Sequence, residues 1–320
     1  MFIHGMGHWH PETQLDNAFL ESLDLGTTDT WIRQRVGIRA RHTALSLDYI
    51  RSTRNQDPRE AAAAASCDGI EMAARAAAVA MARAGVSPGD IGMVIAGSSA
   101  PAQTAPATAS LVAERLGIAA PAFDMNAACS SFVLHASVLA SWPFSGFVLT
   151  VYPEDLTRAV DYRRREAAVL MGDGAAACVW SKRERGPILV SEARFGSDPT
   201  GSSKVGIRNG GHLVQDGPAV QSFAIKRSVA LVRDLRCDHQ IFVGHQANLR
   251  MLQAVCNHAE IPSERHLWNV DIRGNCGAAG APSVISERWH DILAGASDLV
   301  IVQVGAGLAW GGFRMRCVRD

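Results

Sequence analysis

Three residues with side chains that can transfer an acyl group stand in short turns rich in small residues. Cys129 lies in the run AACSSF, His245 in the run GHQANLR and Asn275 in the run GNCGAAG. A thiol can attack a thioester and hold the acyl group, while an imidazole and a carboxamide can stabilise the negative charge that develops on oxygen. The three residues therefore predict covalent acyl transfer, provided that the fold brings them together across separations of 116 and 30 positions.

Each of the three residues also has a plainer interpretation when it is taken alone. A free cysteine is more often buried in the core, a single histidine is more often structural, and Gly-Asn-x-Gly is first of all a turn. Cys129 follows a predicted strand at 121–125 and opens a predicted helix at 130–142, so the helix N-terminus should lower the pKa of its thiol. His245 follows a predicted strand at 241–243, at the strand end where open α/β sheets bind ligands.

The elements that must position these side chains alternate along the chain. Short apolar runs predict buried strands at 93–96, 146–151, 175–180, 241–243 and 298–304, and helical patterns occupy 61–84, 107–116, 130–142, 220–235 and 249–258. Such alternation predicts a layered α/β protein. A charged break at 181–187 predicts two halves, with the cysteine in 1–182 and the histidine and asparagine in 183–320, and the Gly- and Ser-rich stretch 197–217 predicts a long surface loop.

The bulk composition excludes several classes of protein. With 320 residues, the chain has room for about two domains or one duplicated unit. Lys+Arg and Asp+Glu are both 31, so no overall field favours nucleic acid or an anionic membrane, and an acidic partner would need a local basic patch. The seven cysteines include no Cys-x-x-Cys pair, and no secretory signal or 20-residue apolar run occurs. We therefore expect a cytoplasmic protein with free thiols, no structural metal and no membrane span.

Six segments in order along the chain carry a family resemblance. They are WIRQRVGIRAR at 31–41, AACSSF at 127–132, MGDGAAA at 171–177, GHQANLR at 244–250, GNCGAA at 274–279 and GAGLAWG at 305–311. Together they resemble the β-ketoacyl-acyl carrier protein synthase III family of the thiolase-fold superfamily. The resemblance implies a five-layer αβαβα fold built from two similar halves, and a homodimer.

The resemblance also implies a role for each of the three residues. Cys129 would take an acyl group from acyl-CoA, which is a substrate rather than a cofactor. His245 and Asn275 would then bind the thioester carbonyl of malonyl-acyl carrier protein during a decarboxylative Claisen condensation. The backbone N–H groups of Cys129 and Ala306 would form the oxyanion hole.

Further residues match substrate-binding positions of the family. Trp31 and Arg158 resemble residues that clasp the CoA adenine, Arg35 resembles one that holds its phosphate, and Asn248 resembles a substrate-binding residue. Lys226 and Arg250 resemble basic residues that dock the acidic carrier protein.

The chain departs from the family pattern at several positions. Typical members have GNTSAAS where this chain has GNCGAAG, and they often have an aromatic residue at the position of Val304 and Gly at that of Ala306. Ala105 stands where straight-chain members often have a Phe that closes the acyl pocket, which predicts an acyl group larger than acetyl. The departures also leave open an acyltransferase that delivers the acyl group to a hydroxyl or amine in secondary metabolism.

A finer resemblance concerns two basic stretches. Residues 47–59 and 158–165 resemble the 3-oxopimeloyl-carrier protein synthase of some biotin pathways, which uses glutaryl-CoA. An arginine that reached the acyl pocket could pair with the distal carboxylate of such a substrate.

Other function classes fit less well. A nicotinamide-dependent oxidoreductase would need an early Gly-x-Gly-x-x-Gly, and a serine hydrolase would have Ser where Cys129 stands. A non-catalytic partner subunit would lack one of the three residues, all of which are present.

Overall fold

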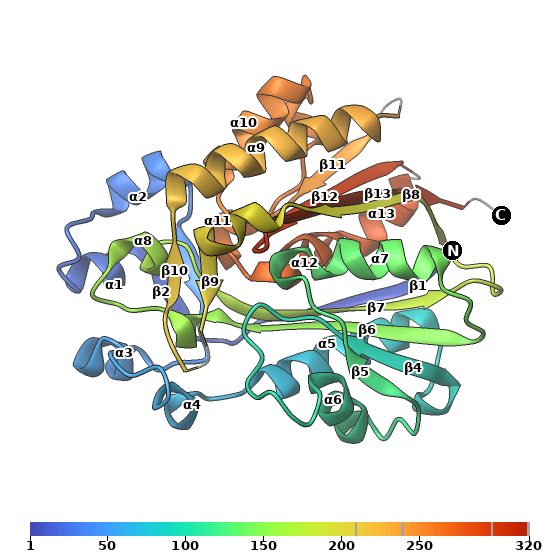
Figure 1. Ribbon diagram of the computed structural model, residues 1–320, viewed down its shortest axis with the longest axis horizontal. Coiled ribbons are helices and arrows are strands. Elements are labelled where there is room, and N and C mark those ends of the chain that lie inside the picture. The colour runs from blue at the N-terminus through green and yellow to red at the C-terminus, as the bar shows by residue number, and fades with distance from the viewer. Residues whose placement is uncertain (209, 238–239, 296, 319–320) are drawn as a thin grey trace.

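The computed structural model describes residues 1–318 except 209, 238, 239 and 296 (Figure 1). Nine strands form one mixed sheet in the spatial order β11-β12-β13-β8-β1-β7-β6-β4-β5. They are β1 Phe2–Trp9, β4 Ile91–Ala96, β5 Ala122–Asp124, β6 Phe147–Asp155, β7 Asp173–Ser181, β8 Ile188–Ser197, β11 Ile241–Gly244, β12 Leu299–Gly305 and β13 Ala309–Cys317. Two further sheets have two strands each: β2 Gln14–Asp16 pairs with β3 Ala40–His42, and β9 Val205–Ile207 forms a hairpin with β10 Leu213–Gln215.

The helices cover the sheet in layers (Figure 1). They are α1 Asn17–Ser22, α2 Asp29–Arg35, α3 Leu47–Thr53, α4 Ala61–Ala64, α5 Gly69–Ala84, α6 Thr108–Leu116, α7 Ser131–Ser141, α8 Arg165–Ala168, α9 Gly217–Asp234, α10 Leu249–Ala259, α11 Val270–Arg273, α12 Gly280–Glu287 and α13 Trp289–Gly295. Figure 1 shows α5 and α6 outside one half of the sheet, α9 and α10 outside the other, and α7 and α12 between the halves. Phe132 of α7 contacts both halves, with ring centroids 5.9 Å from Trp180 of β7 and 5.2 Å from Phe313 of β13.

The strand order repeats one topology twice. In the first half, the five strands in chain order lie third, second, fourth, fifth, first, as β5-β4-β6-β7-β1. In the second half, a parallel bridge from Phe242 to His266 adds a short extended segment beside β11, and the order 266-β11-β12-β13-β8 is the same. The halves meet where Phe2 and Ile3 pair with Leu189 and Ile188. The repeat agrees with the predicted pair of similar halves, whose boundary at residues 182 and 183 stays a prediction.

The predicted strands and most predicted helices are confirmed to within a few residues, but two predictions are wrong. The single helix at 61–84 is broken, because Ser66 donates its N–H to the Ala44 carbonyl and Asp68 caps a new helix by accepting from the Glu71 N–H at 2.8 Å. The stretch 197–217 is not a structureless loop, since it holds a 3₁₀ turn at Pro199–Lys204 and the β9–β10 hairpin. The first correction depends on a backbone partner 22 positions away in the sequence, Ala44, whereas the second depends on a hairpin between nearby segments.

All seven cysteines are free. Across the described residues, no helix is long and apolar enough to cross a bilayer.

Candidate active site

Cys129 is held on a tight turn between β5 and α7. The turn is a short 3₁₀ helix, Ala128–Ser130, and Ala128 adopts a positive φ of 47°. The Ser131 hydroxyl braces it by accepting from the Ala127 N–H at 3.0 Å and donating to the Ala128 carbonyl at 2.7 Å. Gly97 is required beside this hydroxyl, because a Cβ at residue 97 would lie 2.4 Å from the Ser131 Cβ. The turn therefore presents the thiol at a defined place ahead of the helix.

The pKa of the Cys129 thiol differs from the prediction. Burial, together with the negative charge of Glu154, raises it to about 12, whereas the helix N-terminus was expected to lower it. The prediction was wrong because removal of water from the sulfur and a nearby carboxylate outweigh the partial charge of the helix end. The resting thiol is therefore protonated and needs a proton acceptor before it can attack.

His245 follows β11 and is almost completely buried, with 6% of its surface exposed. Burial lowers its pKa to about 4, so the imidazole is neutral at physiological pH. Its Nδ1 atom has no hydrogen-bond partner among the described residues. A neutral imidazole has one N–H to donate, which suits a developing oxyanion without adding a full positive charge.

Asn275 is anchored through its main chain and through its own side chain. Its N–H donates to the Leu170 carbonyl at 2.8 Å, and its carbonyl accepts from the Gly172 N–H at 3.1 Å. Its side-chain Oδ1 accepts from the Gly277 N–H at 3.0 Å. Because Oδ1 is engaged in this way, the NH₂ group is the part of the carboxamide available to a ligand.

The three residues line one largely apolar cavity of about 440 Å³. Ala306, Trp31 and Asn248 also line this cavity, as predicted substrate-site residues would. Asn248 has a structural task as well, because its Oδ1 caps α10 by accepting from the Met251 N–H at 2.7 Å. The loop after β12 packs against the nucleophile turn, where a Cβ on Gly305 would lie 2.9 Å from the Ser130 nitrogen.

The residue that faces Trp31 is Arg165 rather than Arg158. The Arg165 guanidinium lies 4.8 Å from the centre of a Trp31 ring, and both residues line the cavity. Arg158 instead makes a 2.8 Å ion pair with Asp155. The structure therefore does not bring Trp31 and Arg158 together, because the chain turns between the two arginines, where the Tyr162 N–H bonds to the Arg54 carbonyl.

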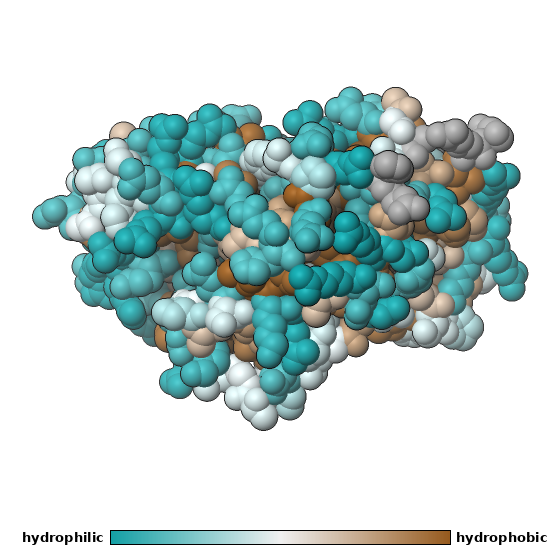
Figure 2. Space-filling view, turned by 90° about the horizontal axis from the view of Figure 1, so that it is seen from above, coloured by the Kyte–Doolittle hydropathy of each residue, from teal (hydrophilic) through white to brown (hydrophobic). Residues whose placement is uncertain are grey.

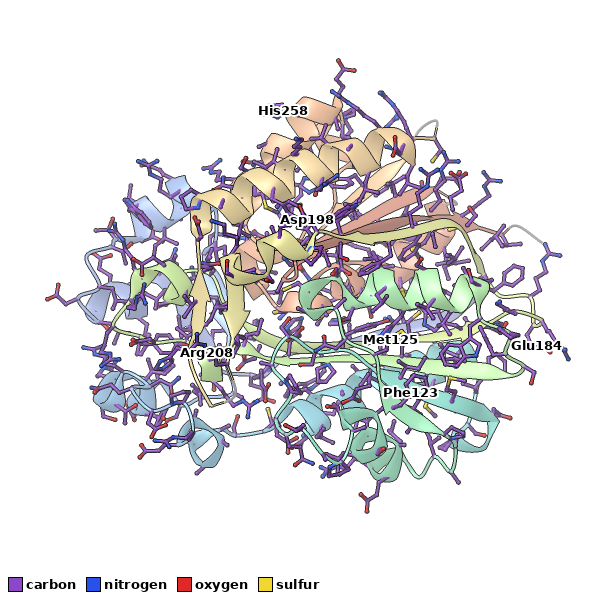
Figure 3. The ribbon with its side chains drawn as sticks, in the orientation of Figure 1. Phe123, Met125, Glu184, Asp198, Arg208 and His258 are labelled. Carbon is purple, nitrogen blue, oxygen red and sulfur yellow. The ribbon has the colours of Figure 1, made fainter. Side chains whose placement is uncertain are left out.

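Arg158 lines a second cavity, of about 350 Å³, next to the first. Ser99 and Ile207 line both cavities. Arg208, labelled in Figure 3 near the β9–β10 hairpin, also lines the second cavity. The Arg158 Nε atom is buried and has no hydrogen-bond partner in the part of the chain that the structure describes.

Four other predicted residues lie outside the main cavity. Arg35, Arg250 and Lys226 are exposed on α2, α10 and α9. Arg250 also holds α10 against α2, because its guanidinium donates to the carbonyls of Gln34 and Arg33 at 3.1 Å. Ala105 is exposed and does not line the cavity of its own chain.

Sequence reasoning missed two residues next to Cys129. The Ser99 hydroxyl lies 3.4 Å from the Cys129 sulfur and donates to the Glu154 carboxylate at 2.8 Å. Glu154 is completely buried at the end of β6. The signal that could have found it is a carboxylate that continues a buried apolar strand, since a buried unpaired charge is rare without a purpose.

Comparisons with known proteins agree on one family. Residues 123–199 match the family described as 3-oxoacyl-[acyl-carrier-protein (ACP)] synthase III, and residues 236–317 match the C-terminal part of the same family. The chain is 33% identical to β-ketoacyl-[acyl-carrier-protein] synthase III of Xanthomonas campestris pv. campestris, over 98% of this chain and 97% of that protein. It is 31% identical to the protein of the same name from Coxiella burnetii, over 97% of each.

The fold is also similar to solved structures of proteins with this family's name. The fold is similar to 3-oxoacyl-[acyl-carrier-protein] synthase III from Aquifex aeolicus, with a TM-score of 0.86 and 27% identity over 98% of this chain and 99% of that one. It is also similar to 3-oxoacyl-(acyl carrier protein) synthase III from Pseudomonas aeruginosa, with a TM-score of 0.81 and 29% identity over 99% and 98%. The thiolase-like α/β fold expected from the sequence is therefore confirmed.

Proposed function

The chain belongs to the β-ketoacyl-acyl carrier protein synthase III family of condensing acyltransferases, and from this premise we propose that Cys129 carries the acyl group and that His245 and Asn275 activate the second substrate. The observation that carries the proposal is the shared cavity, in which a thiol, a neutral imidazole and an oriented carboxamide meet. Such enzymes make 3-oxoacyl-carrier protein.

In the first half-reaction, the Cys129 sulfur attacks the thioester carbonyl of acyl-CoA and CoA leaves as its thiolate. The tetrahedral intermediate carries a negative oxygen, which the backbone N–H groups of Cys129 and Ala306 would stabilise. The tight packing of Gly305 against the nucleophile turn supports this assignment, because it brings the 305–308 loop beside the thiol.

In the second half-reaction, the malonyl group on the carrier protein loses CO₂. The resulting enolate oxygen accepts hydrogen bonds from the His245 ring and the Asn275 NH₂ group, and the enolate carbon attacks the acylated Cys129. Burial supports these roles, since a hydrogen bond in a site with little water is stronger than one in solvent.

We propose that Trp31 and Arg165 clasp the CoA adenine, in place of the predicted pair of Trp31 and Arg158. The adenine would lie beside the two groups, where an arginine and an aromatic face both favour a flat ring. Arg35, at the exposed end of α2, stays the proposed phosphate contact.

We propose that the carrier protein docks on the side formed by α2, α9 and α10. Lys226 and Arg250 are exposed there, as are Arg33 and Arg35. Figure 2, which views the molecule from above α9 and α10, shows hydrophilic residues over this face. A local group of cations supplies the patch that the balanced net charge of the chain could not reveal.

The proposed acyl group is larger than acetyl, with a glutaryl chain as the specific candidate. The second cavity beside Ser99 supports this, because Arg158 and Arg208 would offer positive charge to a distal carboxylate. The Arg158–Asp155 ion pair would weaken that attraction, while the buried Arg158 Nε atom has no hydrogen-bond partner among the described residues.

A homodimer is the proposed assembly. The strand β5 ends the sheet, and an unpaired edge strand readily pairs with a second copy. Phe123 and Met125, labelled in Figure 3, lie on and beside this strand. The exposed position of Ala105 fits the same assembly, since it could close an acyl pocket only on a second copy.

The proposed function is tested by intact mass after mixing the protein with acetyl-, butyryl-, octanoyl- and glutaryl-CoA in turn. We expect an acyl adduct in the wild type and no adduct in Cys129→Ala. Cys67→Ala is the control, because Cys67 is also a partly exposed free cysteine, and this variant should still form the adduct. Adding malonyl-carrier protein should then release CO₂ and form a 3-oxoacyl-carrier protein.

An adduct that survives in Cys129→Ala would overturn the assignment of the nucleophile. Transfer of the acyl group to a hydroxyl or amine without CO₂ release would favour the alternative acyltransferase. If glutaryl-CoA leaves no adduct, the glutaryl proposal is rejected while the rest stands.

A further inference from the structure

Glu154 is a buried carboxyl group without a counter-charge. It is 0% exposed, and no ion pair involves it within the described residues. It accepts from the Ser99 N–H at 3.0 Å, from the Ser99 hydroxyl at 2.8 Å and from the Ala278 N–H at 2.8 Å. Burying an ionised carboxylate costs several kcal/mol unless other groups compensate for the lost water. The half-reactions described above give this group no task.

Ser99 connects this carboxyl group to the reactive sulfur. The Ser99 Oγ atom lies 2.8 Å from Glu154 Oε1 and 3.4 Å from the Cys129 sulfur. A hydroxyl has one hydrogen to donate and two lone pairs to accept with. While Glu154 is ionised it takes that hydrogen, so the Cys129 S–H must be the donor to Ser99. The three groups therefore form a series of hydrogen bonds in which the Cys129 thiol donates to the Ser99 hydroxyl and the Ser99 hydroxyl donates to the Glu154 carboxylate.

The backbone at Gly277 lies so close to Ser99 and Glu154 that a side chain at residue 277 would contact both. A Cβ at Gly277 would lie 2.6 Å from Glu154 Oε1 and 3.0 Å from the Ser99 hydroxyl oxygen. Gly277 is also one of the three positions at which the run GNCGAAG departs from the motif GNTSAAS, which has Ser there. A side chain at 277 and a carboxylate at 154 exclude each other, so the motif departure and the buried acid belong to one arrangement.

We propose that Ser99 and Glu154 are a proton relay for Cys129, with Ser99 as a catalytic residue and Glu154 as a positioning residue that acts through it. The inference rests on the proposed function of Cys129. The relay gives the Cys129 thiol a proton acceptor, so His245 does not need to accept this proton.

The relay balances over the two half-reactions. As the sulfur–carbon bond to the acyl group forms, the thiol proton moves to Ser99 and the Ser99 proton moves to Glu154, while the bond to CoA breaks and CoA leaves as a thiolate that takes a proton from solvent. In the condensation, the enolate carbon bonds to the acyl carbon and Cys129 leaves as a thiolate. The proton stored on Glu154 then returns through Ser99 to the sulfur.

The charge states of the site agree with this sequence. Burial raises the pKa of Glu154 to about 8, so the group can change its charge near physiological pH. Once it holds the proton it is neutral, so Glu154 no longer repels the malonyl carboxylate that enters the site. The high pKa of the Cys129 thiol explains why an acceptor is needed.

The test compares acylation of Cys129 by acyl-CoA in single turnovers across pH. Glu154→Gln keeps an oxygen to accept the Ser99 and Ala278 hydrogen bonds but cannot take a proton. We expect its acylation rate constant to fall about 100-fold, with little change in the half-saturating acyl-CoA concentration, because general-base catalysis typically contributes 10²- to 10⁴-fold. The wild-type rate should rise with pH as Glu154 ionises, and this rise should disappear in Glu154→Gln.

Two further variants separate a relay from a structural role. Ser99→Ala should lose as much rate as Glu154→Gln, and Ser99→Thr, which keeps the hydroxyl, should recover much of it. Asp173→Asn is the matched control, because Asp173 is an equally buried carboxyl group on the neighbouring strand that binds Ala44 and Thr157 instead of the site. It should leave the pH profile of acylation unchanged.

The relay is overturned if Glu154→Gln acylates within about threefold of the wild type or keeps its pH-dependent rise. If Glu154→Gln does not fold, the Ser99→Ala and Ser99→Thr pair decides, and equal rates in that pair reject the relay. Failure of the wild type to form an adduct on Cys129 would instead reject the proposed function.

Discussion

Substitution of Gly277 by Ala tests the packing on which the buried carboxyl group depends. Gly277 has a φ of +49°, and a Cβ there would lie 2.6 Å from Glu154 Oε1. The left-handed backbone alone should cost roughly 1–2 kcal/mol for Ala. Moving the carboxylate away would weaken at least one of its charged hydrogen bonds, each worth about 1.5–3 kcal/mol. The expected loss in free energy of unfolding is therefore about 2.5–5 kcal/mol.

Gly117→Ala is the matched control. Gly117 has a φ of +68°, and a Cβ there would meet nothing within 4 Å. It should show the backbone cost alone, so urea unfolding should place Gly277→Ala roughly 1.5–3 kcal/mol below it. In a Glu154→Ala background the clash with the carboxylate is gone and only the Ser99 hydroxyl remains close, at 3.0 Å, so Gly277→Ala should then cost nearly as little as Gly117→Ala. Equal losses for the two single variants would refute the reasoning.

Three further predictions concern charge and substrate binding. The pKa of Glu154 is raised to about 8 in the folded state, so its contribution to stability is complete below its unfolded pKa of 4.5 and is lost as pH rises toward 8. Between these two pH values, the free energy of unfolding measured in urea should fall by up to about 1.4 kcal/mol per pH unit. The fall should be shallower in Glu154→Gln. Arg165→Ala should raise the KM for acyl-CoA about fivefold or more while Arg158→Ala leaves the KM of acetyl-CoA unchanged, and the opposite result would restore the original pairing with Trp31. Lys226→Glu should raise the KM for malonyl-carrier protein and not that for acyl-CoA, whereas Arg115→Glu, on the opposite outer layer in α6, should change neither.

Short-range patterns carried much of the prediction. The buried strands, most helices and the turns around Cys129, His245 and Asn275 are visible as local runs, because small residues, apolar runs and helix formers act over a few positions. The break between α4 and α5 was missed because Ala61 to Ala84 has good helical propensity throughout. The backbone bond from Ser66 to Ala44 decides against a single helix, and no local pattern reports it.

The errors at the site have a common physical origin. Arg158 and Arg165 are both arginines in one basic run, and only the turn between them decides which one reaches Trp31. The direction of the Cys129 pKa was wrong because desolvation and the charge of Glu154 depend on position in space. Glu154 itself is one acid in a chain that holds 31 acidic residues, and nothing in its sequence neighbourhood marks it as the neighbour of Ser99.

The sequence by itself determined the family, the α/β layering and the types of the reactive side chains, since these follow from local composition and motif order. Only the tertiary structure decided how the thiol loses its proton. Burial and hydrogen-bond distance arise when β6, the loop after β4 and the turns at 129 and 277 converge. Those quantities decide whether the buried Glu154 carboxyl group only costs stability or can also accept a proton.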